Sequence, residues 1–277
     1  MRLKIPQKSQ ESGASFVPIL ERLPVLSCYA KTRGWYYVTS WLHRFTGIGL
    51  FIALMVWTVG FPSWRFSNVF NTDASIPAQP ILVFLGLATS LIVSLHALNG
   101  GRLILYELFG RRNDESMMRW VFGLSVAYAA TVALIMLMES RRVSTFFFWG
   151  AAFFFGAVAA AVVRSRLSGK RHSVLWKLQR LTGAFLFVTA PAYVLFLCLN
   201  PYAADGTNGT VLGMQHVFAQ LTFLTMTTSA LYHAVYGLFS IAADYVSPGV
   251  TRAGMTALIV ILVAVLAVLA FRIVLSV

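Results

Sequence analysis

Long apolar segments alternate with shorter polar ones along most of this chain. Several of the apolar runs exceed the roughly 18 residues that indicate a membrane-spanning helix. The pattern predicts spans at roughly 37–60, 80–108, 119–138, 144–163, 176–199, 213–243 and 254–276. We therefore expect an all-α integral membrane protein with about seven transmembrane helices, because only helices and closed barrels satisfy their backbone groups in lipid.

The composition agrees with this expectation. Hydrophobic residues make up 58% of the chain and charged residues 11%, which excludes an ordinary soluble domain. The net charge of +13 does not indicate a nucleic-acid partner, because no groove-like pattern of basic and aromatic residues accompanies it. The two cysteines, Cys28 and Cys198, are too few for an iron–sulfur cluster, which typically needs four. We expect both to be packed thiols.

A short polar pattern occurs twice within the apolar segments. A histidine is followed by a glycine four residues later and a carboxylate eleven residues later, and each member recurs 137 positions on: His96 and His233, Gly100 and Gly237, Glu107 and Asp244. Upstream, the run from Arg44 to Gly47 is echoed by Arg180 to Gly183 at an offset of 136. We interpret this as a duplication in which each copy supplies one histidine to a shared centre.

Seven spans divide into two groups of three with one span between them. A three-span unit ends on the side opposite its start, so a second copy with the same orientation needs one extra crossing. The copies are therefore predicted to be parallel repeats. The expected regions are an N-terminal arm (1–36), a first three-helix repeat (37–138), a connector helix with a basic loop (139–174) and a second three-helix repeat (175–277).

The basic residues predict the topology. An N-terminus in the cytoplasm leaves only Arg65, Arg141, Arg142 and Arg272 outside, and the other 18 of the 22 Lys and Arg residues inside. This bias favours the N-inside orientation. No apolar core follows the first basic residues, so a cleaved signal peptide is not expected. The arm is expected to lie on a partner or on the membrane surface.

Eleven helical residues cover roughly 16 Å, so His96 and His233 would lie near mid-bilayer if Glu107 and Asp244 mark the cytoplasmic ends. A lone histidine at that depth is often only a packing residue. Two at equivalent positions of parallel repeats favour axial ligation of a haem iron. Gly100 and Gly237, each one turn away from its histidine, provide close helix packing, clearance for a porphyrin, or both.

Haem propionates need cationic partners, and three arginines lie toward the predicted cytoplasmic side: Arg44, Arg102 and Arg180. Charges at such depth are costly without a specific anion or polar cavity. The alternative is that Arg44 and Arg180 are interfacial residues whose charged ends extend to the headgroups.

These motifs resemble a known family. Ser40-Trp41-Leu42-His43-Arg44, with His96 to Glu107, is similar to the cytochrome b membrane subunit of succinate dehydrogenase and fumarate reductase (complex II). His233 to Val246 resembles its hydrophobic membrane-anchor partner. The family usually has two separate three-helix chains, which this sequence joins through an extra span. The resemblance covers residue 37 to the C-terminus.

The resemblance implies a site residue by residue. His96 and His233 would be the axial ligands of one haem b, with His43 and Arg180 at its propionates beside Arg44 and Arg102. Quinone would bind at Ser40, Arg44, Asp244 and Tyr245. The chain departs from the family pattern at Leu103, where histidine is frequent, and at Glu107, where aspartate is frequent. Leu103 removes one expected propionate contact.

A haem held by two histidines has no open position for a substrate, so electron transfer is its natural role. The chain has no dinucleotide fingerprint, iron–sulfur ligand set or nucleophile triad, so it is not expected to oxidise succinate alone. The family implies docked iron–sulfur and flavoprotein subunits that pass electrons to ubiquinone or menaquinone in the tricarboxylic acid cycle and respiratory chain. It also implies a bacterial inner membrane and allows a higher oligomer. A second haem is not expected, since His216 has no facing histidine and His172 belongs to a solvated loop.

Three other classes remain open on the sequence alone. The first is a haem-b anchor serving another respiratory dehydrogenase, such as a hydrogenase or formate dehydrogenase. The second is a haem-free scaffold for soluble subunits. A transporter is less favoured, because Pro191 has no counterpart in the first half to form a pair of broken helices.

Overall fold

The computed structural model describes residues 35–55, 79–110, 114–137, 143–199 and 217–275. The regular elements in these ranges are all α-helices: α3 (Trp35–Met55), α5 (Gln79–Phe109), α6 (Asp114–Met136), α7 (Thr145–Leu167), α8 (Val174–Leu199), α10 (Val217–Tyr245) and α11 (Val250–Leu275). Each helix coincides with one predicted span, and the predicted all-α fold is confirmed. The connector span, predicted as 144–163, extends one turn further, to Leu167.

Four of these helices are long and apolar enough to cross a membrane. The crossing segments are Ser116–Met136, Thr145–Leu167, Val174–Phe196 and Val250–Leu269. The described parts of α3, α5 and α10 do not reach the same hydropathy. α5 and α10 carry the histidines and acidic residues of the repeated pattern, and α3 carries His43 and Arg44.

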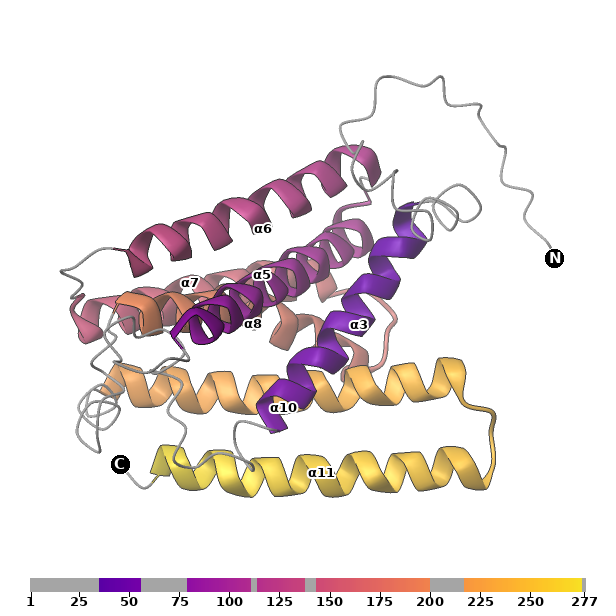
Figure 1. The fold of residues 1–277 in the computed structure, drawn as a ribbon. Coiled ribbons are helices and arrows are strands. Elements are labelled where there is room, and N and C mark those ends of the chain that lie inside the picture. Colours follow the sequence, from indigo (N-terminus) through magenta and orange to yellow (C-terminus); the bar gives the residue numbers. More distant parts are fainter. Residues whose placement is uncertain (1–34, 56–78, 111–113, 138–142, 200–216, 276–277) are drawn as a thin grey trace.

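Four helices form the centre of the bundle. α3 packs against α5, α5 against α8, and α10 against both α8 and α3. α6 lies on α5 and α11 lies on α10, so these two helices occupy opposite edges of the molecule (Figure 1). The connector helix α7 packs mainly along α8 and α10. Each central helix therefore borders helices from both predicted repeats.

The first helices of the two predicted repeats run in the same direction. α3 is antiparallel to α5, because residue numbers rise along α3 while they fall along α5: Thr39 contacts Asn99, and His43 contacts His96. α5 is antiparallel to α8 for the same reason, since Gly101 lies against Phe187 and Glu107 contacts Arg180. Consequently α3 and α8 are parallel to each other, which is the relation that parallel copies require.

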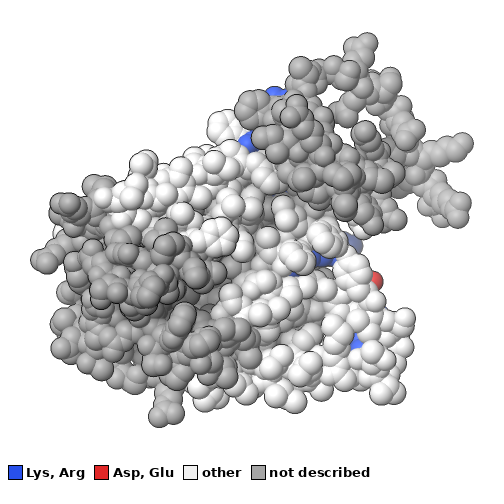
Figure 2. Space-filling view, viewed as in Figure 1, with Lys and Arg blue, Asp and Glu red and all other residues white. Residues whose placement is uncertain are grey.

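Charged residues lie at one end of the described bundle. On the face drawn in Figure 2, some charges lie near the place where α10 stops and α11 starts, others lie at the top over α6, and most of the remaining described surface is uncharged. Arg252 belongs to this end, where its guanidinium donates to the main-chain oxygens of Ala243 and Val246. The structure thus separates a polar end from apolar sides, as the spans predict.

The remaining single-residue expectations have mixed outcomes. Cys198 is buried in a core cluster with Val132, Met136 and Val194, as a packed thiol was predicted to be. His172 is exposed and its ring lies 4.0 Å from that of Trp176, in agreement with a solvated loop residue. Cys28, His216 and the N-terminal arm lie outside the described residues.

Candidate functional site: a buried histidine cluster and two ion pairs

Two histidines join α3 to α5 through reciprocal hydrogen bonds. The Nδ1 of His43 lies 3.1 Å from the main-chain oxygen of His96, and the Nδ1 of His96 lies 3.1 Å from that of His43. Since a carbonyl oxygen only accepts, each Nδ1 carries the hydrogen. In a neutral imidazole this leaves the Nε2 lone pair available for a ligand. Thr46 adds a hydroxyl oxygen 3.1 Å from the Nδ1 of His96.

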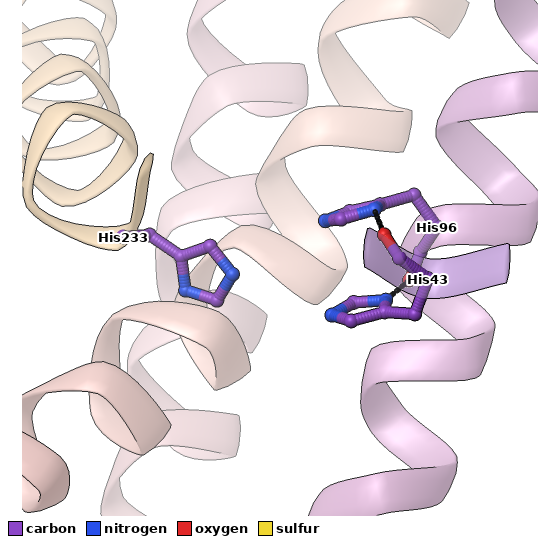
Figure 3. A group of neighbouring side chains, drawn as sticks. All are labelled: His43, His96 and His233. Atoms are coloured by element: carbon purple, nitrogen blue, oxygen red, sulfur yellow. Dashed lines mark hydrogen bonds between the residues drawn. The ribbon is translucent and has the colours of Figure 1, made fainter. Parts of the chain in front are cut away.

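The third histidine approaches from the other predicted repeat. The rings of His43 and His96 are stacked, with centroids 4.1 Å apart and planes 14° apart, and His233 of α10 faces them (Figure 3). The centroids of His96 and His233 are 6.3 Å apart, with their planes at 84°. One ligand atom from each of the three rings lies within 4.8 Å of the others. The structure therefore brings together the two predicted axial residues and adds His43 beside them.

Glycines make room for the rings. A Cβ added at Gly47 would lie 2.9 Å from Cε1 of His96, and one added at Gly100 would lie 2.9 Å from Cε1 of His43. Gly183 is in the same relation to His233, at 3.1 Å. Gly100 thus accommodates a histidine ring of the neighbouring helix. A Cβ added at Gly237 would meet nothing within 4 Å.

Two arginines form ion pairs across the predicted repeats. Arg44 of α3 contacts Asp244 of α10 at 2.6 Å, and Arg180 of α8 contacts Glu107 of α5 through two hydrogen bonds of 2.5 and 2.7 Å. The arginines are equivalent by the 136-residue offset and the acids by the 137-residue offset. Each copy therefore supplies one arginine and one acid, in the self-complementary pattern of a twofold interface.

The residues predicted to bind quinone gather around Arg44. Its Nη1 donates to the hydroxyl oxygen of Tyr245 at 3.2 Å, and its guanidinium carbon lies 5.6 Å from the centroid of that ring. Ser40, one helical turn before Arg44, has a buried Oγ without a hydrogen-bond partner in the described part of the chain. Ser40, Arg44, Asp244 and Tyr245 thus form one neighbourhood, which the exposed Tyr245 opens to the surroundings.

Arg102 is held inside the bundle. It is 1% exposed, its Nε donates to the side-chain oxygen of Asn99 at 3.0 Å, and its guanidinium carbon lies 5.4 Å from the ring centroid of Tyr106. Asn99 in turn donates to the main-chain oxygen of Thr39 at 2.5 Å. Arg102 therefore belongs to a polar connection between α5 and α3.

Sequence reasoning assigned no role to Thr46, Asn99 or Gln179. Gln179 donates from Nε2 to the main-chain oxygen of His233 at 3.2 Å, as His43 does to that of His96. The signal was present, because Gln179 follows His43 by the same 136 residues that separate the two arginines. Nδ1 of His233 is buried without a hydrogen-bond partner in the described part of the chain.

Comparison with known proteins identifies the C-terminal part of the chain. No curated protein and no solved structure matches the chain. Residues 159–271, which include Arg180, His233 and Asp244, match the model of the succinate dehydrogenase/fumarate reductase transmembrane subunit family. Over these residues the chain is similar to the membrane anchors of complex II.

Proposed function

We propose that this chain is the cytochrome b membrane anchor of a succinate:quinone oxidoreductase, combining the cytochrome b subunit and the hydrophobic anchor subunit. The observation that carries the proposal is the convergence of His96 and His233, from equivalent positions, in a chain whose second half matches the family. Two imidazoles facing each other from opposite sides are the ligand set of a haem with no open coordination position. A bound haem b would supply one-electron transfer.

The donor set fits such a group. His96 is oriented by His43 and Thr46, which is the outer-shell support that a metal-ligating histidine normally has. The unpartnered Nδ1 of His233 is compatible with ligation through Nε2. His43 and Arg102 are the proposed propionate partners nearest the cluster, with Arg44 toward the polar end. Arg180, the remaining proposed propionate partner, is paired with Glu107.

Quinone is proposed to bind beside Arg44. Arg44 and Tyr245 supply hydrogen-bond donors for a carbonyl oxygen, and the unpartnered hydroxyl of Ser40 supplies another on the same face of α3. Reduction of a quinone to a quinol takes up two electrons and two protons. Asp244 is 47% exposed and contacts Arg44, so its carboxylate lies between water and the proposed quinone position.

Electrons must reach this site from partners, because the chain has no flavin fingerprint or iron–sulfur ligand set. We propose an iron–sulfur subunit carrying a flavoprotein subunit, docked on the basic end of the bundle. That end would face the cytoplasm of a bacterium, with the N-terminus inside. The family match favours succinate or fumarate as the organic substrate over a hydrogenase or formate dehydrogenase role.

The test is a reduced-minus-oxidised spectrum of the purified complex. Wild type is expected to show a b-type haem absorbance and to co-purify with succinate-oxidising subunits, and His233→Ala is expected to lose the absorbance. His172→Ala, which alters an exposed loop histidine, is the matched control and should keep it. A colourless wild-type complex that still contains its partners would favour the haem-free scaffold instead.

A further inference from the structure

The two ion pairs occupy equivalent positions but have different neighbours. Arg44 has Ser40 one helical turn before it, and Arg180 has Trp176 at the equivalent position, again at an offset of 136. Where Asp244 is followed by Tyr245, Glu107 is followed by Leu108, at the offset of 137. The serine and the tyrosine of the proposed quinone site are therefore replaced by a tryptophan and a leucine at the second position.

The first pair is open. Arg44 and Asp244 share one contact, and their side chains are 38% and 47% exposed. Tyr245 next to them is 59% exposed, and the buried hydroxyl of Ser40 has no hydrogen-bond partner in the described part of the chain. The side chains of this pair are therefore partly open to a ligand that brings hydrogen-bond acceptors.

The second pair is covered. Arg180 and Glu107 form two hydrogen bonds, which is the stronger, geometrically fixed form of an ion pair, and their side chains are 20% and 34% exposed. The guanidinium carbon of Arg180 lies 4.6 Å from the ring centroid of Trp176, and Nζ of Lys170 donates to the main-chain oxygen of Glu107 at 2.6 Å.

The connector helix completes this cover. Leu108 is 8% exposed and belongs to a core cluster with Val163 and Leu167 of α7, against which Trp176 also packs. The helix that joins the two copies thus fills the space beside the second position.

We infer that the Arg180–Glu107 pair is a closed clamp between the two copies, with α7 as its cover, and that only the Arg44 position accepts a quinone. The statement that only the Arg44 position accepts a quinone rests on the proposed function, whereas the clamp does not depend on it. Arg180 and Glu107 are then positioning residues: they hold α8 against α5, the helix that carries His96.

The experiment compares equivalent substitutions in the purified complex, with thermal midpoint (Tm) and KM for a short-chain ubiquinone as the two measurements. Glu107→Gln is expected to lower Tm by a few degrees, about the effect of losing a charged hydrogen bond, and to leave KM within about twofold. Asp244→Asn is expected to raise KM about tenfold with a smaller change in Tm.

A charge exchange keeps the test decisive if Glu107→Gln assembles poorly. The double variant Glu107→Arg with Arg180→Glu should recover most of the Tm lost in Glu107→Arg alone, because a clamp needs only complementary partners. An equal rise in quinone KM in Glu107→Gln and Asp244→Asn, or no recovery in the exchange, would overturn the clamp. An unchanged KM in Asp244→Asn alone would instead refute the quinone site and leave the clamp intact.

Discussion

His43 and His96 each donate an Nδ1 hydrogen to the other's main-chain oxygen, at 3.1 Å in both directions. The two rings consequently have the same tautomer, lie nearly parallel and direct Nε2 toward His233 (Figure 3). The side of the cluster formed by α3 and α5 has two candidate ligands, whereas the side formed by α10 has one.

This asymmetry predicts unequal effects of removing the axial histidines. His96→Ala is expected to keep part of the b-type absorbance, because a ring nitrogen of His43 lies within 4.8 Å of the ligand atom that is lost. His233→Ala is expected to lose all of it. Reduced-minus-oxidised spectra at equal protein concentration measure the difference.

The double variant His43→Ala with His96→Ala is the control, and it should be as colourless as His233→Ala. If the single variant His96→Ala is also colourless while it assembles normally, then His43 cannot replace the lost ligand.

Gly47 offers a second test on α3. Gly47→Ala places a methyl group 2.9 Å from the ring of His96, and we expect it to lower the free energy of unfolding by about 1–3 kcal/mol and to reduce haem content. Gly49→Ala is the matched control on the same helix, since its added Cβ meets nothing within 4 Å. It should be neutral or stabilising by about 0.5–1 kcal/mol. Thermal unfolding and haem-to-protein ratio measure both; equal behaviour of the two variants would contradict the contact.

We expect Thr46 to influence the midpoint potential of the haem iron through its contact with His96. Its hydroxyl donates to the main-chain oxygen of Leu42 at 2.8 Å and so can accept from Nδ1–H of His96. Thr46→Val removes this acceptor, makes the imidazole a weaker base and should raise the haem midpoint potential.

The equivalent change in the second copy, Thr182→Val, is the control for Thr46→Val. The Thr182 hydroxyl contacts only the main-chain oxygens of Leu178 and Gln179 in the described structure. A redox titration in which both variants shift the potential equally would mean that Thr46 does not act through His96.

A hydrogen bond of Tyr128, away from the site, is expected to contribute to the stability of the bundle. The Tyr128 hydroxyl donates to the main-chain oxygen of Pro191 at 2.7 Å and joins α6 to α8. Tyr128→Phe should cost about 1 kcal/mol of unfolding free energy, a fall in Tm of roughly 2–4 °C, with haem content unchanged. A wild-type Tm would show that the hydrogen bond adds nothing to the packing of these helices.

The helices could be predicted because lipid imposes a simple rule: an apolar run long enough to cross must satisfy its backbone within itself. The proximity of His96 and His233 was also predictable, from the shared offset alone. Which acid pairs with which arginine was not, since Arg44 could equally have met Glu107 of its own copy. That choice depends on how α3 and α8 cross the neighbouring copy, which no local pattern encodes.

The contact between His43 and His96 was the main feature that the sequence did not predict. The family resemblance implied a role for His43 at the propionates, which stays a prediction. The structure puts His43 on His96, because Gly47 and Gly100 let α3 and α5 approach until each ring covers the other helix's glycine. Only a pair of helices already docked together reveals that complementarity.

The four positions 43, 47, 96 and 100 therefore cannot vary independently. A larger residue at either glycine requires a smaller one at the opposite histidine, and a change of either histidine leaves a void above a glycine. Homologous chains that keep this crossing should exchange these residues in concert or not at all, which makes their joint variation a record of how α3 and α5 meet.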